Sequence, residues 1–310
     1  YFYNDELQKS LSYDNRALDI CRTIFGENNF TYYLSQKDVA RDYFFLEDYA
    51  SAWQYQNLCC SNLKHYFCDN LYEFNSFSRE SFWNRYSFIF DSDIPYYCFY
   101  TPNHLEAPTI LYDYSALFSK GLLLNMELSV RDQILESSDS TTIRQYDEIQ
   151  QKKSIISRLY ELPLNERFID VDSLEKEVRK QENELLKISK AYGDYTRSLN
   201  IKWEDVQQSL GEKDLAVEFL SFRAKNDSIM YIALTLDKDD SIPMMIPLFE
   251  KKQLDSISAH DYYTTDSLYH LIWYPLVQEL EGKENVYFSP AGALHNIGIE
   301  YLPIDSTLNI

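Results

Sequence analysis

The stretch DLAVEFLSFRAKNDSIMYIALTL, residues 214–236, decides the class of fold to which this chain belongs. Its first part, residues 214–222, alternates in the manner of a strand. Its second part, residues 228–236, is a more continuous apolar run, which suits a strand that is buried on both faces. The connection RAKND, residues 223–227, is short enough for a hairpin. The stretch therefore predicts two paired strands of a sheet.

Three more elements of the same domain follow along the chain. Residues 244–248 predict a short third strand, and Pro247 favours the edge of the sheet because it cannot donate a ladder hydrogen bond. Residues 266–280 predict a helix that is kinked near Pro275, and residues 286–289 predict the next strand. This order of strands and helix is typical of an α/β domain, and we expect only the start of that domain in this chain.

The chain before Trp203 predicts helices, because only three of the seven glycines lie in that part and turns between strands are scarce. Residues 111–135 read as one long helix, and residues 141–162 read as another that Pro163 ends. We expect the second of these to pack antiparallel on a third helix, joined through residues 163–171.

The third helix has a start signal and an apolar face. It begins with Asp172 as its N-cap and with Glu175 three residues later, as in a capping box. Its apolar positions recur at heptad-like spacing, too briefly for a sustained coiled coil. They are Leu174, Val178, Leu185, Ile188 and Tyr192.

The first hundred residues suggest an internal repeat. Residues 17–29 look like the end of one helical hairpin, and residues 39–60 supply a second, with small side chains such as Ala52 and Cys59 where two helices must approach closely. Residues 70–110 contain three prolines and look like a degenerate repeat with an irregular connection.

This spacing resembles the tetratricopeptide repeat, in the long variant known from kinesin light chains. Gln36 stands where that repeat usually has tryptophan, and Glu47 stands where it usually has a turn glycine. One repeat cannot bury its own apolar face, so we expect neighbouring repeats before Tyr1 or after Phe67. An ordinary helical hairpin is the alternative interpretation.

The composition disfavours several classes of function. The formal net charge is −20, so the surface repels nucleic-acid backbones and anionic membranes. No apolar run approaches the roughly 18 residues of a membrane helix. Five cysteines without a CxxC pair fit reduced thiols in the cytoplasm and give almost no support to a zinc site. The chain begins without methionine, and we expect it to be a piece of a longer protein; a signal removed before Tyr1 stays an alternative.

The sequence contains no complete catalytic motif. No cysteine follows Trp203, and neither a Gly-x-Ser-x-Gly elbow nor a glycine-rich phosphate loop occurs. The histidines show no metal-ligand spacing. They are His65, His104, His260, His270 and His295.

His295 is the strongest single candidate for a catalytic base. If residues 294–299 form a strand, His295 and Ile297 share one of its faces. A base needs a nucleophile within hydrogen-bond reach, and the thiols all lie in the helical part. We therefore interpret His295 as a structural or groove-lining residue. A hydrolase that uses it with an aspartate or a serine is the weaker alternative.

Two stretches together resemble a known family of domains. One runs from WEDVQ, which begins at Trp203, through residues 214–219 and 231–234; the other joins YFSPAGAL, residues 287–294, to IEYL, residues 299–302. They resemble the opening half of a CHAT domain, a caspase-like cysteine peptidase domain that often follows tetratricopeptide repeats. Residues 111–124, from LYD to KGLLL, also resemble the helical region before such domains in bacterial proteins.

The resemblance implies a peptidase with a Cys–His dyad that its repeats regulate. In the family, the histidine sits in a His-Gly motif after a later strand, and the cysteine follows another strand. His295 is followed by Asn296 and comes too early, so we expect the dyad beyond Ile310. No residue of this chain is assigned to catalysis, to a cofactor or to a metal.

The predicted architecture is α + α/β in three parts. Residues 1–110 are expected to form tetratricopeptide-like helical repeats, residues 111–202 long helices and a helical hairpin, and residues 203–310 an incomplete caspase-like α/β sheet domain.

The leading functional hypothesis is a fragment of a repeat-regulated caspase-like cysteine peptidase whose helical repeats bind a protein or peptide partner. We expect this chain alone to hydrolyse nothing, and to bind neither nucleic acid nor membranes. The alternative is a non-catalytic interaction scaffold with an inactive α/β module.

Overall fold

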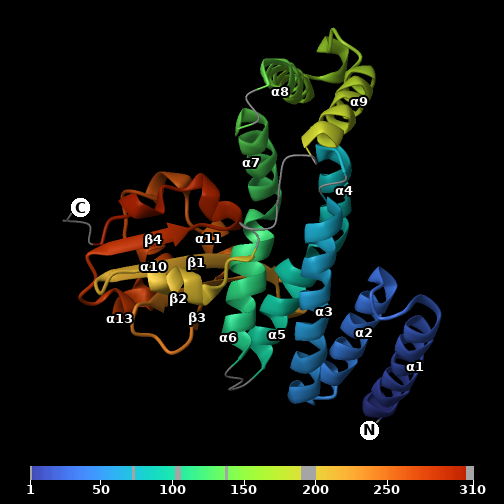
Figure 1. Ribbon diagram of the computed structural model, residues 1–310. Coiled ribbons are helices and arrows are strands. Elements are labelled where there is room, and N and C mark those ends of the chain that lie inside the picture. Colours follow the sequence, from blue (N-terminus) through green and yellow to red (C-terminus); the bar gives the residue numbers. More distant parts are fainter. Residues whose placement is uncertain (1, 72–73, 102–105, 137–138, 190–199, 305–310) are drawn as a thin grey trace. The chain divides into compact units, whose positions relative to one another are not determined.

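A computed structural model of the chain describes residues 2–71, 74–101, 106–136, 139–189 and 200–304 (Figure 1). These residues are mostly helical, and a four-stranded mixed sheet lies in the C-terminal part. The chain divides into two compact units. The first comprises Tyr1–Leu63, Ser87–Lys120 and Ile201–Ile310, and the second comprises Lys64–Tyr86 and Gly121–Asn200. The predicted domain boundaries after residues 110 and 202 divide the sequence into segments and do not describe these compact units. They stay a prediction.

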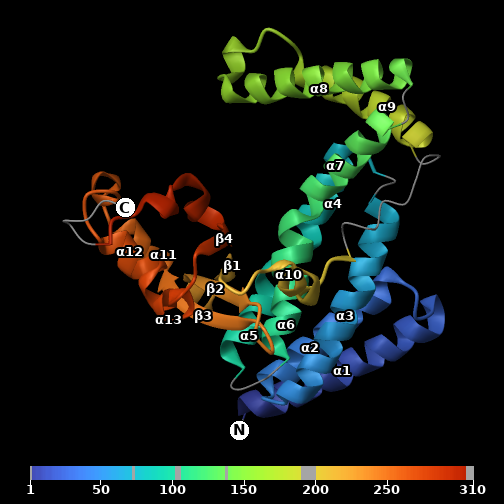
Figure 2. The same ribbon diagram turned by 60° about the vertical axis from the view of Figure 1, so that its left-hand side comes forward.

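The N-terminal helices follow one another as hairpins (Figure 1 and Figure 2). They are α1 (Phe2–Phe25), α2 (Phe30–Phe45) and α3 (Tyr49–Asn70). Gly26 turns the chain between α1 and α2 with a φ of 81°, and Asn29 caps α2 by accepting a hydrogen bond from the Thr31 amide at 2.9 Å. Glu47 has a φ of 64° between α2 and α3, in the left-handed region where the repeat pattern has glycine.

Small and aromatic side chains fill the space between α2 and α3. Ala40, Ala52 and Cys59 are buried, as the repeat interpretation requires of small residues at a close helix contact, and Val39 is buried as well. Gln36, at the usual tryptophan position, is also buried, and its amide oxygen accepts a hydrogen bond from Asn62 at 3.2 Å. These contacts explain the hairpin, and the tetratricopeptide assignment remains a resemblance.

Residues 70–110, which the sequence predicted to be a degenerate repeat with an irregular connection, form helices over most of their described part. They are α4 (Ser76–Tyr86), a π-helical turn (Ile89–Asp93), α5 (Ile94–Tyr100) and α6 (Ala107–Ile110). Pro95 and Pro108 lie in the first turns of α5 and α6, where the missing amide hydrogen costs nothing, and Pro102 lies outside the described residues. The long helix predicted next is a π-helical segment, Leu111–Ser119, that continues into α7 (Lys120–Glu136).

The predicted helical hairpin of the second unit is confirmed. It consists of α8 (Ser140–Glu161) and α9 (Val171–Ser189), which run antiparallel, as the pairing of Tyr160 with Glu175 and of Lys153 with Glu182 shows. The predicted face of α8 is buried, with Tyr146, Ile149, Ile156 and Leu159 inside. On α9, Val178 and Leu185 are buried, whereas the Ile188 side chain and Tyr192 lie outside the described residues.

The prediction of Asp172 as the N-cap of α9 is wrong. Asp170 takes that role, because its carboxylate accepts hydrogen bonds from the Asp172 amide at 3.1 Å and from the Ser173 hydroxyl at 2.7 Å. Glu175 accepts instead from the Tyr160 hydroxyl at 2.6 Å, a partner on another helix that the local spacing did not reveal.

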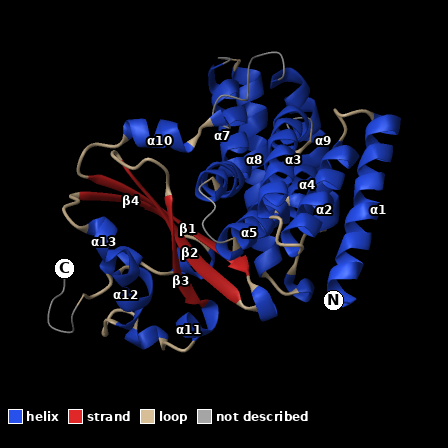
Figure 3. Cartoon of the chain, turned by 90° about the horizontal axis from the view of Figure 1, so that it is seen from below, coloured by secondary structure: helices blue, strands red, loops and turns tan. Residues whose placement is uncertain are grey.

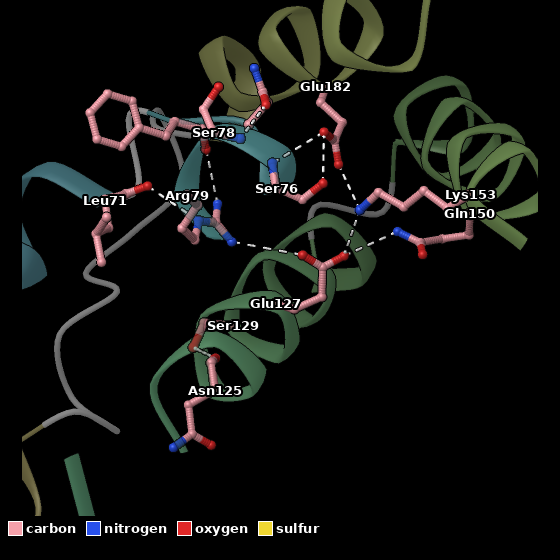
Figure 4. A network of polar contacts seen from close by, with 12 residues as sticks. Leu71, Ser76, Ser78, Arg79, Asn125, Glu127, Ser129, Gln150, Lys153 and Glu182 are labelled. Carbon is pink, nitrogen blue, oxygen red and sulfur yellow. Dashed lines mark hydrogen bonds and ion pairs between the residues drawn. The ribbon is translucent and has the colours of Figure 1, made fainter. Parts of the chain in front are cut away.

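A charged network ties the helices of the second unit together (Figure 4). Lys153 of α8 lies 2.6 Å from a Glu182 oxygen of α9 and 3.2 Å from a Glu127 oxygen of α7. The other Glu182 oxygen accepts from the Ser76 hydroxyl at 3.0 Å, at the start of α4. Buried Arg79 lies 3.7 Å from Glu127 and donates to the backbone carbonyls of Leu71 and Phe74. Each buried charge therefore has an opposite charge beside it, as burial requires.

The sheet confirms four of the predicted strands, those over residues 214–222, 228–236, 244–248 and 286–289. It consists of β1 (Asp214–Arg223), β2 (Ile229–Asp237), β3 (Met244–Glu250) and β4 (Asn285–Ser289), in the order β3-β2-β1-β4. The β1–β2 hairpin is antiparallel with Phe219 opposite Ala233, β3 is antiparallel to β2, and β4 is parallel to β1. Pro247 lies on the edge strand β3, as predicted.

Helices cover both faces of this sheet. Short helices cover one face (Figure 3), and the kink expected at Pro275 is a 3₁₀ turn (Tyr274–Leu276) between two of them. They are α11 (Lys251–Asp255), α12 (Ser267–Ile272) and α13 (Val277–Leu280). On the other face, Phe99 of α5 contacts Phe222 of β1 with ring centroids 5.5 Å apart. Burial on both faces explains why β2 reads as a continuous apolar run.

One ion pair joins the helical segment to the sheet within the first unit. The Lys120 ammonium donates to a Glu218 oxygen at 2.9 Å, to the Phe219 carbonyl at 3.1 Å and to the Ser289 carbonyl at 2.8 Å. Burial lowers the pKa of Lys120 and raises that of Glu218, and the attraction between the two charges opposes both shifts. The three hydrogen bonds use all the donors of the ammonium.

We expect Lys120→Met to lower the free energy of unfolding by about 3 kcal/mol, because it leaves Glu218 buried without its partner. Urea denaturation measures this loss. Lys251→Met is the matched control, since it breaks an exposed pair with Asp255, and it should cost less than about 1 kcal/mol. Equal losses in the two variants would contradict the assigned role of Lys120.

Asp93 makes the stability of the first unit depend on pH. Burial raises its pKa from 3.8 to about 6, although Lys37 and Arg41 lower it. The folded state therefore holds a proton that the unfolded state has released, and stability falls as the pH rises from about 4 to about 6.

Asp93→Asn should raise the free energy of unfolding by about 1–2 kcal/mol at pH 7.5 and leave it unchanged near pH 4, because the amide carries no charge to bury. Urea titrations at both pH values test this, with exposed Asp19→Asn as the control. A variant that is less stable than the wild type at pH 7.5 would refute the assignment.

Candidate functional site

A groove of about 610 Å³ lies beside β4 in the first unit. Its volume is in the range of about 300–1,000 Å³ that is usual for ligand sites. Apolar side chains dominate its walls, and the polar ones are Gln278, Glu281 and Glu300. The apolar lining includes Trp273, Val286, Phe288, Ile299 and Leu302.

Trp273 fixes the wall of the groove. Its indole N–H donates to the Ile299 carbonyl at 2.7 Å, which holds the 3₁₀ turn Ile299–Tyr301 in place. Its ring meets Phe219 of β1 and Phe288 of β4 edge to face, each with centroids 5.6 Å apart. Because a hydrogen bond and two ring contacts constrain it, the wall is built before any ligand arrives.

The outer edge of β4 borders this groove. In the described part of the chain, β4 pairs only with β1, so its other edge presents backbone groups without a strand partner. Val286 and Phe288 line the groove, whereas Tyr287 between them is 59% exposed.

Gly292 of the Ser-Pro-x-Gly motif packs tightly against the sheet. Its φ is 52°, and a Cβ atom added there would lie 2.7 Å from the Tyr231 hydroxyl and 3.1 Å from the Ser221 hydroxyl. The same Tyr231 hydroxyl accepts a hydrogen bond from the Ala293 amide at 3.0 Å. The glycine therefore serves both the backbone conformation and the close approach to β1 and β2.

His295 does not lie on a strand, so the strand predicted over residues 294–299 is wrong. The chain forms two 3₁₀ turns instead, Gly292–Asn296 and Ile299–Tyr301, because the left-handed Gly292 starts a turn rather than a strand. Leu294 points inside and His295 is exposed. Among the described residues, no hydrogen bond or ion pair of the His295 ring is present, so the structure brings no nucleophile to it.

Four of the five thiols are buried and therefore poorly reactive. Cys59, Cys60, Cys68 and Cys98 are buried and unpaired within helices. Burial raises the pKa of Cys68 to about 11 and that of Cys98 to about 12, and it also raises the pKa of Cys59 and of Cys60. A thiol with such a pKa is protonated at neutral pH and is a poor nucleophile. Half-buried Cys21 accepts a weak hydrogen bond from Ser35 at 3.4 Å, and it lies on α1, away in sequence from the groove.

The described residues contain no group of three or more His, Cys, Asp or Glu side chains that could hold a metal ion. His65, His260 and His270 are exposed, and His104 lies outside the described residues. Within the same ranges, no helix combines the length and the apolar character needed to span a membrane.

Comparisons with protein-family models, curated proteins and solved structures found no match for this chain. Lys120, Glu218 and Ser289, which lie in three separate segments of the sequence, join in one set of hydrogen bonds. The sequence did not reveal the groove, because its walls come from segments whose apolar residues each read as ordinary core. The clustered aromatic residues of LIWYPLV, residues 271–277, were the available signal.

Gly292→Ala should lower the free energy of unfolding by about 2–3 kcal/mol, since it combines a left-handed backbone with a clash against Tyr231. Gly282→Ala is a matched control, because Gly282 has a φ of 77° with nothing within 4 Å of the added Cβ. That control should cost only about 1 kcal/mol. Denaturation curves that show equal costs would disprove the close-packing role of Gly292.

Proposed function

We propose that this chain is the non-catalytic part of a repeat-regulated caspase-like cysteine peptidase, whose His–Cys dyad comes from residues outside 1–310. One observation carries the proposal: four of the five thiols are buried in helices, while His295 is exposed without a described partner. Peptide hydrolysis by a thiolate needs a cysteine and a histidine within hydrogen-bond reach. This chain supplies the scaffold and not the reacting groups.

The outer face of α1 supports the second half of the proposal, that the helical part binds a protein partner. Tyr13, Ala17, Ile20 and Ile24 are spaced by four, three and four residues, which places them along one face of the helix. Tyr13 is 72% exposed, Ile20 47% and Ile24 66%. An exposed apolar stripe of this kind fits an antiparallel amphipathic helix of a partner protein, as in stacked helical repeats.

A non-catalytic interaction scaffold is the second candidate, and the burial of the same four thiols favours it. The two candidates differ in the parent sequence after Ile310. A His-Gly motif after an apolar strand, with a cysteine at the end of a later strand, supports the peptidase. Absence of both motifs supports the scaffold.

We expect the purified chain to cleave no peptide in a substrate library, and only Cys21 to react with Ellman's reagent before denaturation. Burial protects the other four thiols. Cys21→Ser should abolish the rapid reaction and leave four thiols that react in denaturant. Iodoacetamide-sensitive proteolysis by the chain, or rapid labelling of Cys98, would overturn the proposed function.

A further inference from the structure

Four carboxyl groups and two cations gather where α1 packs on α2, within the first unit. They belong to Asp14 of α1, to Lys37, Asp38, Arg41 and Asp42 of α2, and to Asp93 of the π-helical turn Ile89–Asp93. With all these groups ionised, the negative charges outnumber the positive ones. Like charges in a partly buried place repel one another, so the cluster favours the uptake of protons.

Arg41 is shared by the carboxyl groups that meet across the contact between the two helices. Its Nη2 atom lies 3.1 Å from an Asp14 oxygen and 3.5 Å from an Asp42 oxygen. Its Nη1 atom lies 3.1 Å from Asp38, which Lys37 also approaches to 3.1 Å. Since Lys37 compensates Asp38, one guanidinium remains for two carboxylates, and one negative charge of that pair has no counterpart.

The Asp42 side chain shows where this surplus charge lies. It is only 3% exposed, and its Oδ2 atom is buried without a hydrogen-bond partner. The Asp14 carboxyl group lies within hydrogen-bond reach of Asp42. Two ionised carboxylates can only accept hydrogen bonds, so a bond between these two groups requires a proton on one of them.

We propose that Asp14 and Asp42 share one proton across the contact of α1 with α2, and that release of this proton as the pH rises loosens α1. Burial raises the pKa of Asp14 above its ordinary value of 3.8, and so do the charges of Asp42 and Asp38, against the attraction of Arg41. The docked helix therefore holds a proton that the undocked helix releases. Its stabilisation is complete below the ordinary pKa and is lost as the pH rises through the raised one.

The other ionisable groups beside the cluster act in the same direction or stay neutral. Asp93, whose pKa is about 6, gains a negative charge as the pH rises. Tyr97 and Cys59 lie near it and remain protonated, because burial raises the pKa of both. Ionisation of Asp93 therefore adds to the repulsion that opposes the docking of α1.

This inference goes beyond the proposed function and does not depend on it. The helix that responds to pH is the one that carries the exposed stripe of Tyr13, Ile20 and Ile24. The charge cluster itself joins α1 to α2, so the pH response is the same whether the chain belongs to a peptidase or to a scaffold.

Hydrogen exchange of the full chain tests the proposal. Mass spectrometry follows the exchange at pH 5.0 and pH 7.5, with correction for the pH dependence of the intrinsic exchange rate. We expect the protection of α1 to fall about tenfold between these pH values, relative to that of α8 in the second unit. An unchanged ratio would overturn the proposal.

Asp14→Asn separates a shared proton from a simple ion pair. The Asn amide donates to Asp42 at either pH, so the protection of α1 at pH 7.5 should rise about tenfold, to the wild-type value at pH 5.0. If Asp14 served only as the ion-pair partner of Arg41, the same substitution would lower it. Asp42→Asn places the donor on the other partner and should also remove the pH dependence.

Asp19→Asn is the matched control on the same helix. Asp19 is exposed and pairs with Arg22 at 2.8 Å, so this variant should keep the pH dependence of the wild type. Circular dichroism confirms that the variants fold. Lower protection of α1 in Asp14→Asn, or a pH dependence that Asp93→Asn removes and Asp14→Asn leaves intact, would refute the shared proton.

Discussion

The Lys120 ammonium is the contact on which the first unit depends. It joins the start of α7 to two strands at once, through the Glu218 carboxylate and the carbonyls of Phe219 and Ser289. Ser289 ends β4, directly before the turn that Gly292 makes possible. A buried charge is stable only where its partners are complete, so the end of β4 and Lys120 are held by the same contact.

The turn at Gly292 also shapes the groove. Gly292 lies against Tyr231 and Ser221, and the chain then continues into 3₁₀ turns that Trp273 holds through the Ile299 carbonyl. The apolar wall of the groove thus results from packing that serves the fold itself. The site is preorganised because its walls are also part of the core.

The same fold keeps reactive groups apart. The helices bury four thiols, and the left-handed Gly292 directs the following residues into turns that leave His295 in solvent. The charged network of Glu127, Lys153 and Glu182 gives the second unit its own means of holding helices together.

The sequence by itself determined the secondary structure wherever periodicity was strong. It predicted the β1–β2 hairpin, Pro247 on an edge strand, the α8–α9 hairpin and the kink at Pro275, because each pattern is local and repeats over neighbouring residues. The sequence-based prediction was wrong where a single residue decides the local backbone structure, at the N-cap of α9 and in the segment after Gly292. Only the tertiary structure could decide the groove and the Lys120–Glu218 pair, whose partners stand 98 residues apart. Local patterns carry no information about which distant side chains a fold will bring together, since that depends on how whole elements pack.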